Sequence, residues 1–301
     1  MISIKKILGA NFRRNMRYVL SFVPDKLYLQ IHYLLTTGRL INFKNPKFFS
    51  EKLQWLKINE RNFDYSKLVD KLAVREHIAK TLGEEHLFPL LGTWDSFDEI
   101  NFETLPNQFV LKCNHDSGST KVIKDKSALT QTDIDALKVH FTNRLKREYF
   151  YAGREYPYKN LKPCIIAEQF MIDESEPQKS IEDYKFFCFN GKPEIMFVAT
   201  DRNIDVKFDF FDMDFNHLDI ENIHPQSGKD IQKPNMFDEM KEIAAKLSQG
   251  IKHVRIDLYE LNGRIYFGEY TFFHGGGFAL MYPLKWEKKL GDLIDVSKNN
   301  K

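Results

Sequence analysis

Two stretches of the chain carry residues whose types and spacing could bind a metal ion and phosphate groups. In one, Asp257 stands five residues before the turn pair Asn262-Gly263, and Glu269 stands six residues after it. Both acids therefore lie near the open end of a predicted hairpin, with Thr271 on the same face as Glu269. Two carboxylates and a hydroxyl suit Mg²⁺ that also binds nucleotide phosphates. Simple solvation of each acid is the alternative, and it is weaker for Asp257 because its two neighbours are apolar.

The second stretch, from Phe109 to Val122, reads as a hairpin with a tip of mostly small residues. The strand-like run Phe109–Cys113 contains Lys112, and a second strand-like run begins at Lys121. A phosphate could approach the backbone N–H groups of the tip, from Asp116 to Thr120, above the positive charge of Lys112. The alternative is an ordinary Ser-Gly turn that binds nothing.

Composition limits the classes of protein to consider. A chain of 301 residues can form one large domain or two to three subdomains, and 43% apolar residues exclude general disorder. The 44 basic and 42 acidic residues nearly cancel, which does not favour nucleic acid as a partner. The three cysteines, Cys113, Cys164 and Cys188, form no C-x-x-C pair, so we expect reduced thiols and a cytoplasmic protein.

The first 40 residues form a basic amphipathic stretch. Lys5, Lys6, Arg13, Arg14 and Arg17 alternate with apolar residues, and no acid occurs before Asp25. The stretch lacks the pattern of a cleaved signal peptide or of a membrane span. A helix packed on its own domain is one interpretation, and peripheral contact with anionic lipid is the other.

Turn and periodicity signals predict the elements that position the reactive residues. We expect a helix capped by Ser50, a helix over 68–83, a short extended connection over 87–94, and a helix over 130–149. A strand over 164–171 and a helix over 237–249 follow. Asn190-Gly191 and Asn262-Gly263 are expected to close two hairpins.

The order of these motifs resembles the ATP-grasp superfamily. It runs through Asp70-Lys71, Lys112 with its Ser/Gly hairpin, Glu168 at a strand exit, and Asp257 followed twelve residues later by Glu269. Within the superfamily, the sequence closely resembles the TupA-like family, which is named for teichuronopeptide synthesis. The resembling segments cover most of residues 40–295: 43–55, 70–83, 89–98, 109–114, 183–191 and 255–271.

The resemblance implies a role for each matching residue. Lys71 and Lys112 would hold nucleotide phosphates, and the hairpin would close over them. Lys185 and Arg202 would hold the acyl phosphate or its carboxylate precursor, which makes them catalytic together with Lys112. The other implied nucleotide contacts are His115, Ser117, Gly118 and Ser119 at the phosphates, Glu168, Gln169, Phe170 and Met171 at the adenine, and Asp183, or alternatively Glu174, at the ribose. The implied metal ligands are Asp257, Glu269 and Thr271, for Mg²⁺ or alternatively Mn²⁺.

Three positions depart from the family pattern. His115-Asp116-Ser117-Gly118 stands where the family usually has His-Gly-Ser-Gly, which brings a carboxylate close to the triphosphate. Thr271 occupies the place of a metal-binding Asn found in the wider superfamily. The run from His274 to Gly277 replaces a Pro-Gly run and could reshape the acceptor site.

We therefore predict an α+β ATP-grasp fold in which two mixed or antiparallel β-sheet subdomains hold ATP between them. The expected division is a helix-rich N-terminal region over 1–106, a lid subdomain over 107–165, a C-terminal subdomain over 166–296 and a tail over 297–301. The resemblance implies an ATP-dependent carboxylate–amine ligase that forms an amide through an acyl phosphate. Its substrates would be a uronic acid or other sugar carboxylate and an amino acid or amine, in capsule, O-antigen or other surface polysaccharide biosynthesis.

Three other functions remain open. A phosphotransferase would pass the γ-phosphate to a sugar hydroxyl without forming an amide. A glycosyltransferase would bind a nucleotide sugar, but the strand around Asp183 offers no Asp-x-Asp motif. The third alternative is a protein without catalytic activity that binds a nucleotide and serves as a scaffold in a glycan assembly complex. The unusual carboxylate at Asp116 supports this alternative.

Overall fold

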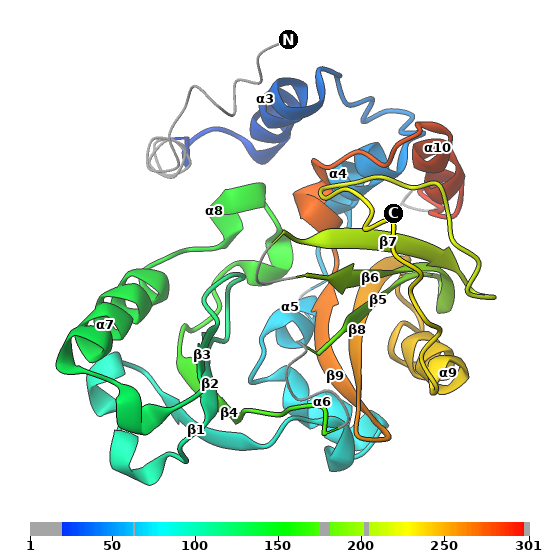
Figure 1. Ribbon diagram of the computed structural model, residues 1–301. Coiled ribbons are helices and arrows are strands. Elements are labelled where there is room, and N and C mark those ends of the chain that lie inside the picture. Colours follow the sequence, from blue (N-terminus) through cyan, green and yellow to red (C-terminus); the bar gives the residue numbers. More distant parts are fainter. Residues whose placement is uncertain (1–19, 63, 175–180, 202–204, 298–301) are drawn as a thin grey trace.

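Two antiparallel sheets, each covered by helices, make up the protein (Figure 1). The computed structural model describes residues 20–62, 64–174, 181–201 and 205–297. The basic residues expected at positions 1–19 lie outside this range. The helices are α3 (Asp25–Thr37), α4 (Phe49–Asn59), α5 (Asp64–Val69), α6 (Val74–Thr81), α7 (Gln131–Leu145), α8 (Phe150–Gly153), α9 (Phe237–Leu247) and α10 (Lys285–Asp292).

The strands fall into two groups along the chain. They are β1 (Leu90–Trp94), β2 (Phe109–Cys113), β3 (Lys121–Ile123), β4 (Ile165–Gln169), β5 (Asp183–Phe189), β6 (Lys192–Thr200), β7 (Lys207–Asp212), β8 (His253–Leu261) and β9 (Arg264–Thr271). Short 3₁₀ turns complete the described elements: η1 (Glu84–His86), η2 (Phe97–Glu99), η3 (Phe102–Thr104), η4 (Lys126–Ala128), η5 (Tyr156–Tyr158) and η6 (His274–Gly277).

The first sheet has the strand order β1-β4-β2-β3 and is covered by α7. Leu137 and Phe141 of α7 pack with Phe109, Leu111 and other buried side chains of the strands. The helix begins as predicted, because Thr130 and Asp133 form a reciprocal capping box at its N-terminus. The sheet joins β1 and β4 to the hairpin, so it draws strands from both sides of the boundaries expected at 106/107 and 165/166. The division into subdomains stays a prediction.

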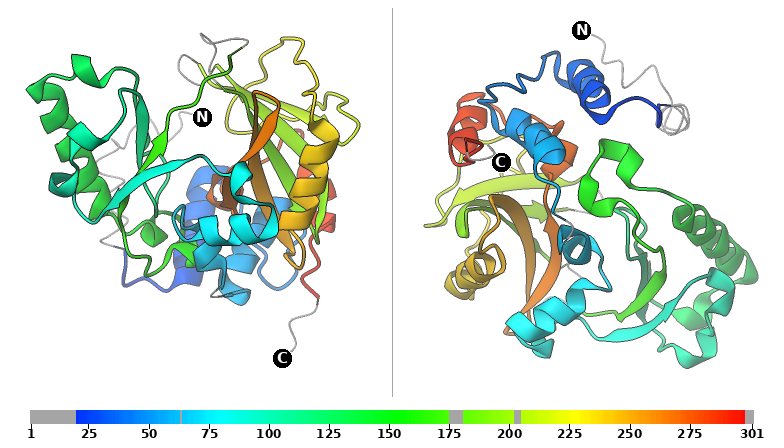
Figure 2. Two further views of the ribbon diagram at one scale, coloured as in Figure 1. Left: turned by 90° about the horizontal axis from the view of Figure 1, so that it is seen from below. Right: turned by 180° about the vertical axis from the view of Figure 1, so that it is seen from behind.

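The second sheet has the order β7-β6-β5-β8-β9, and α9 covers one of its faces. The two Asn-Gly hairpins are confirmed: Asn190, Gly191, Asn262 and Gly263 all have positive φ, as the tight turn between right-twisted strands requires. In Figures 1 and 2, α5 lies between the two sheets, and it contacts β9. The two sheets therefore face one another across α5, which precedes the β2–β3 hairpin in the sequence.

Three expectations about local structure were wrong. The helix expected over 68–83 is broken into α5 and α6, because the Asp70 carboxylate accepts the N–H groups of Leu72 (2.8 Å) and Ala73 (3.2 Å) and competes with helical bonds. The connection expected over 87–94 contains a strand, β1, whose partner β4 comes from far along the chain. Ser50 does not cap α4, which begins one residue earlier. Its hydroxyl instead donates to Glu287 at 2.6 Å.

Candidate active site

Lys112 is placed by β2 beside the end of β4. Its ammonium lies 2.6 Å from Oε2 of Glu168, and the other oxygen of this carboxylate lies 3.4 Å from Nη1 of Arg75. Glu168 is therefore buried between two cations rather than directed toward solvent. The register puts Val110 opposite Glu168, so the lysine and the acid meet across neighbouring strands. The structure thus brings together two of the residues predicted to contact the nucleotide.

The hairpin tip divides into a buried and an exposed part. Ser117 and Gly118 are exposed, and Gly118 has a φ of 82°, which a residue with a Cβ rarely adopts. His115 and Ser119 are buried and already bonded: the Ser119 hydroxyl accepts the N–H of Cys113 at 2.9 Å, and Nε2 of His115 lies 3.1 Å from the carbonyl of Arg147. The exposed pair is therefore better placed for phosphate than the buried pair.

Asp116 is the unexpected residue of the tip, and the structure shows what balances its charge. Its side chain is buried, with one carboxylate oxygen 2.6 Å from Nε of Arg144 on α7. Arg144 also donates to the carbonyl of Ser117. Because an arginine neutralises this carboxylate inside the protein, Asp116 does not present a bare negative charge to a phosphate.

Lys71 links the hairpin to the second sheet. It lies in the turn between α5 and α6, and its ammonium donates to the carbonyl of Asp116 at 2.6 Å. The same ammonium lies 3.9 Å from Oε2 of Glu269 on β9. A single cation therefore touches both groups of residues that the sequence singled out, although they are about 150 residues apart. This contact places the hairpin tip and the acidic strands around one volume.

The opposing cluster lies on one face of β5, β8 and β9. Asp257 pairs with Glu269, as the hairpin pattern predicted, and on its other side it pairs with Lys185 of β5. Lys185 forms an ion pair with Asp257 and another with Asp183 at 2.5 Å. Asp257 and Asp183 are almost fully buried, which is tolerable because each has a cation beside it.

Arg255 occupies the centre of this cluster, a role that the sequence reasoning missed. Its Nε and Nη2 each lie 2.7 Å from an oxygen of Asp257, and Nη2 also reaches Thr271 at 3.0 Å and Glu269 at 3.5 Å. The remaining nitrogen, Nη1, donates to Nδ1 of His274 at 2.7 Å. The available signal was spacing, since Arg255 and Asp257 are two apart on a strand and so share a face.

A chain of hydrogen bonds through His274 and Asn222 orients the Arg255 guanidinium. The Asn222 amide donates to the carbonyls of Ala279 (3.3 Å) and Leu280 (3.0 Å), which turns its oxygen toward His274. His274 donates through Nε2 to that oxygen at 2.7 Å and accepts from Arg255 through Nδ1. This pattern requires a neutral imidazole with its proton on Nε2.

The charges of the cluster agree with this arrangement. Burial and the neighbouring cations Arg255 and Lys185 set the pKa of His274 well below its usual value, so the ring stays neutral. Burial would raise the pKa of Asp257, but the charges of Arg255 and Lys185 outweigh it and lower that pKa. Burial would lower the pKa of Arg255, and the carboxylate of Asp257 outweighs it and raises that pKa. The cluster therefore contains a charged guanidinium beside an ionised carboxylate.

A family model for TupA-like ATP-grasp proteins matches residues 51–295. The chain belongs to the TupA-like ATP-grasp family. Its α+β architecture of two antiparallel sheets with covering helices is the ATP-grasp fold. No curated protein matches the chain.

Several solved ATP-grasp structures resemble the chain at low sequence identity. D-alanine–D-alanine ligase from Bacillus anthracis complexed with ATP is 16% identical with a TM-score of 0.36, and the match covers 68% of this chain and 53% of that one. The RimK domain ATP-grasp protein from Sphaerobacter thermophilus DSM 20745 is 11% identical with a TM-score of 0.39, over 76% and 69%. The ligase PsnB, complexed with a minimal precursor, Mg and ADP, is 13% identical with a TM-score of 0.36, over 74% and 57%. The chain thus spans about half of the first of these ligases.

The predicted metal ligands of this TupA-like protein converge on one point. Asp257, Glu269 and Thr271 all contact the Arg255 guanidinium, which shows that their oxygens favour a positive charge there. Among the described residues no group of three His, Cys, Asp or Glu side chains could hold a metal. Two carboxylates and a hydroxyl nevertheless fit Mg²⁺, since this ion usually takes one or two carboxylates and completes its shell with phosphate and water. When bound, it would neutralise phosphate charge, and Glu269, with 36% of its side chain exposed, is more available than the buried Asp257.

The residues predicted to contact the base and the carboxylate are only partly placed. Gln169 is exposed at the end of β4 with its N–H bonded to the carbonyl of Pro89 at 2.9 Å, and the half-buried Phe170 and Met171 follow it. Arg202 lies outside the described residues. The adenine contacts and the role of Arg202 therefore remain predictions.

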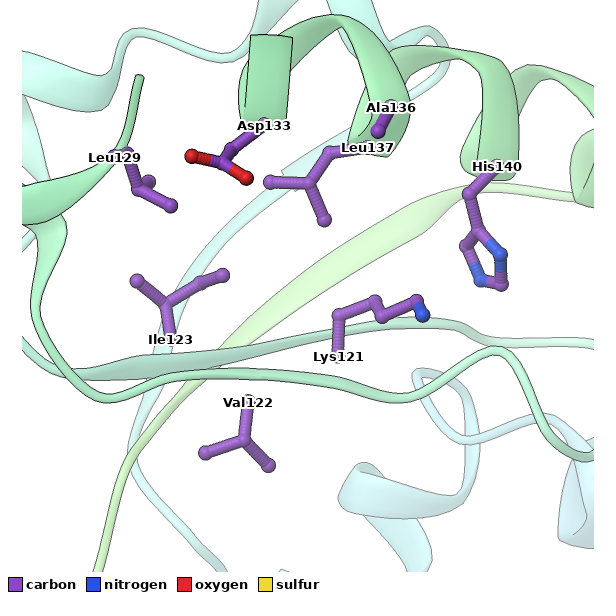
Figure 3. A pocket seen from close by; sticks show the side chains of 8 residues that line it. All are labelled: Lys121, Val122, Ile123, Leu129, Asp133, Ala136, Leu137 and His140. Atoms are coloured by element: carbon purple, nitrogen blue, oxygen red, sulfur yellow. The ribbon is translucent and has the colours of Figure 1, made fainter.

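A separate pocket of about 280 Å³ lies on the far side of the hairpin, between β3 and α7 (Figure 3). It is lined by Lys121, Val122, Ile123, Leu129, Asp133, Ala136, Leu137 and His140. None of these residues belongs to the predicted site.

Proposed function

We propose that the protein is an ATP-dependent carboxylate–amine ligase that forms an amide and releases ADP and phosphate. The observation that carries the proposal is the position of Lys71, a cation that joins the hairpin of Lys112 to the sheet that carries Lys185 and Arg255. Lys71 contacts both sides, with 2.6 Å to the hairpin carbonyl and 3.9 Å to Glu269. Phosphoryl transfer needs placement and neutralisation of charge more than a nucleophilic side chain.

In this proposal, one group of residues binds the triphosphate and another binds the substrate carboxylate. Lys71 and Lys112 would bind its oxygens, together with the N–H groups of Ser117 and Gly118 at the tip. Lys185 and Arg255 would orient the substrate carboxylate, whose oxygen attacks the γ-phosphorus while ADP leaves. The amine then attacks the acyl carbon, loses a proton and displaces phosphate, which completes the amide. Asp257 and Glu269 would hold Mg²⁺ beside the phosphates.

We propose that the acid is a uronic acid or other sugar carboxylate and that the amine is an amino acid or a simple amine. This substrate class, and a place in capsule, O-antigen or other surface polysaccharide biosynthesis, rests on the resemblance to the TupA-like family. A cytoplasmic location with peripheral membrane contact belongs to the same proposal. Among the described residues, no helix is long and apolar enough to cross a bilayer.

The decisive experiment is a screen of ADP release over pairs of uronic acids and amino acids. We expect ADP only when an acid and an amine are both present, and phosphorus NMR should then show inorganic phosphate. ADP release that does not depend on the amine, with a phosphate ester as product, would instead establish the phosphotransferase. Lys185→Met should abolish turnover, whereas Lys192→Met, in the exposed start of β6, should not.

A further inference from the structure

Helix α3 presents an apolar face to solvent. Four large exposed side chains recur at helical spacing along it and form one stripe, and one more is exposed near each end of the helix. The exposed fractions are 81% for Phe22, 53% for Leu27, 46% for Ile31, 44% for Leu34, 57% for Leu35 and 62% for Leu40. Single exposed leucines are common on proteins, but a stripe of this extent marks a surface that contacts something else.

The opposite face of α3 is firmly attached to the protein, so the direction of the apolar stripe is fixed. Tyr28, Leu29 and Tyr33 are buried in a cluster that includes Leu280. His32 stacks on Phe278 with ring centroids 3.9 Å apart, and the Tyr28 hydroxyl donates to the carbonyl of Tyr151 at 3.4 Å. In Figures 1 and 2, α3 lies at the margin of the molecule beside α8.

The charged residues of α3 and of the segments that flank it in the sequence are predominantly positive. The only acid of α3, Asp25, is paired with Arg61 at 3.0 Å and lies 3.6 Å from Arg154 on α8's C-terminal side. Lys26 is exposed inside the helix, and the exposed Lys44 and Lys47 follow Leu40 within a few residues in the sequence. Residues 1–19 lie outside the described part of the chain, and their sequence holds five basic residues and no acid.

We propose that the stripe of Leu27, Ile31, Leu34 and Leu35, together with Phe22 and Leu40 near its ends, inserts into the surface of a bilayer that contains anionic lipids. An apolar face next to unbalanced positive charge is what such a surface binds, whereas contact between two copies would bring like charges together. The helix has 13 residues, about 20 Å at 1.5 Å per residue, so it lies on a membrane and does not span it.

The inference rests on the proposed function, to which it adds the membrane-binding surface of an enzyme for surface glycans. Membrane contact at this surface would bring the active site close to the bilayer. The inner face of α3 stacks on Phe278, four residues beyond His274, which holds Arg255. A glycan substrate presented at the membrane would then have a short path to the cluster of β5, β8 and β9.

Flotation of the full-length protein with lipid vesicles, without ATP or substrates, tests the inference. Vesicles of phosphatidylcholine alone are compared with vesicles that also contain phosphatidylglycerol. We expect binding to the anionic vesicles only, and a loss of about tenfold or more in the double variant Leu27→Gln/Leu35→Gln. The matched control is Val122→Gln/Val139→Gln, which changes two valines of similar exposure, 47% and 60%, on the first sheet and α7.

The outcomes separate this inference from its competitors and from the ligase proposal. Absence of vesicle binding by the wild type, or equal loss in both double variants, overturns it. It is also overturned if light scattering shows a dimer that Leu27→Gln/Leu35→Gln converts to a monomer. Circular dichroism and thermal unfolding establish that each variant is folded. Because no substrate is present, failure of the ligase reaction leaves this test unaffected.

Discussion

At the scale of residues, Arg255 is the side chain that contacts most of the polar groups of the cluster. A guanidinium has five N–H donors in a rigid plane, and here they reach Asp257, Glu269, Thr271 and His274. An arginine held on all sides keeps its charge and its direction while a substrate binds. If the proposed function holds, its environment matters to catalysis as much as the charge itself.

We predict that His274→Ala lowers kcat while the KM for ATP changes little. The substitution removes the acceptor of Nη1, and Arg255 keeps its contacts with Asp257 and Thr271 but loses its orientation. Loss of a hydrogen bond to a charged group costs about 1.5–3 kcal/mol, or roughly tenfold to a hundredfold in rate. Steady-state kinetics measures the split between kcat and KM.

The conservative variant His274→Asn provides the control. An asparagine oxygen lies near the place of Nδ1 and can accept from Arg255, so this variant should recover much of the lost rate. Equal impairment of the alanine and asparagine variants would show that His274 serves packing alone.

We also predict that Lys112→Ala weakens ATP binding by roughly tenfold to a hundredfold, since a charge-assisted hydrogen bond contributes about 1.5–3 kcal/mol. The fold should persist because Glu168 keeps its contact with Arg75 at 3.4 Å. Titration calorimetry measures the binding, and Lys121→Ala, on the partner strand of the same hairpin, is the matched control. Equal ATP affinities of the Lys112→Ala and Lys121→Ala variants would show that Lys112 does not bind the nucleotide.

The sequence could predict the neighbours of Arg255 better than Arg255 itself. The Asn-Gly turn fixes the register of β8 and β9, and the register places Asp257 opposite Glu269. An arginine, by contrast, is usually exposed, and its burial here depends on Asp257, Glu269 and His274 together. The ion pair of Asp116 with Arg144 was equally hidden, because the two residues are far apart in the sequence and meet only where α7 packs beside the hairpin.

At the scale of elements, helix α4 supports the loop that carries His274. Gln54 and Lys57 of this helix donate to the carbonyls of Gly277 and Gly276, both at 2.6 Å, and Lys57 donates also to that of Gly153. A lysine buried in this way satisfies backbone acceptors that would otherwise have no partner. The close approach of helix and loop leaves no room for a side chain at Gly277.

We predict that Gly277→Ala destabilises the protein by about 2–4 kcal/mol and lowers activity. Its φ of 67° strains any L-residue, and a Cβ there would lie 2.5 Å from Nε2 of Gln54 and 3.1 Å from Cβ of Leu53. Gly228→Ala has nearly the same φ, 69°, with no atom within 4 Å, so it should cost only about 1 kcal/mol. Denaturant unfolding of the two variants measures the difference, and equal values would contradict the crowding at α4.

Elements with strong local signals were predictable, and elements defined by distant partners were not. Thr130 with Asp133 marked the start of α7, and the apolar spacing of Met240, Ile243 and Leu247 marked α9. The break between α5 and α6 was missed because the apolar spacing continues through Asp70. Strand β1 was missed because five residues carry little periodicity until β4 pairs with them.

At the scale of the whole molecule, the largest core joins the second sheet to the helices that precede the hairpin. Phe49 and Leu53 of α4 and Ile78 of α6 pack in one cluster with side chains of β5, β6 and β8. The first sheet with α7 has a core of its own. Helices α4 and α6 thus belong structurally with the sheet that carries Arg255, although the sequence places them before the hairpin, and α3 packs in a smaller cluster of its own.

The main core also encloses His253, which makes stability depend on pH. The ring packs against Phe49, Phe187 and Phe189, its Nδ1–H donates to the carbonyl of Cys188 at 3.0 Å, and burial lowers its pKa to about 3. Below about pH 6.5 the unfolded chain binds a proton at this histidine and the folded protein does not. Stability from this group is therefore present above about pH 6.5 and falls by about 1.4 kcal/mol for each unit of pH below it.

His253→Phe isolates this contribution from that of other buried groups, such as Glu155 and Glu287, whose pKa values burial raises. At neutral pH the variant should be less stable by about 1–3 kcal/mol, because the carbonyl of Cys188 loses its donor. Phenylalanine binds no proton, so the difference should vanish after about one to two units of acidification and then reverse. Unfolding free energies measured from neutral pH to about pH 4.5 should therefore cross. Parallel curves for wild type and variant would mean that His253 takes up its proton in the folded core, and the aromatic packing around it would have to open to admit that charge.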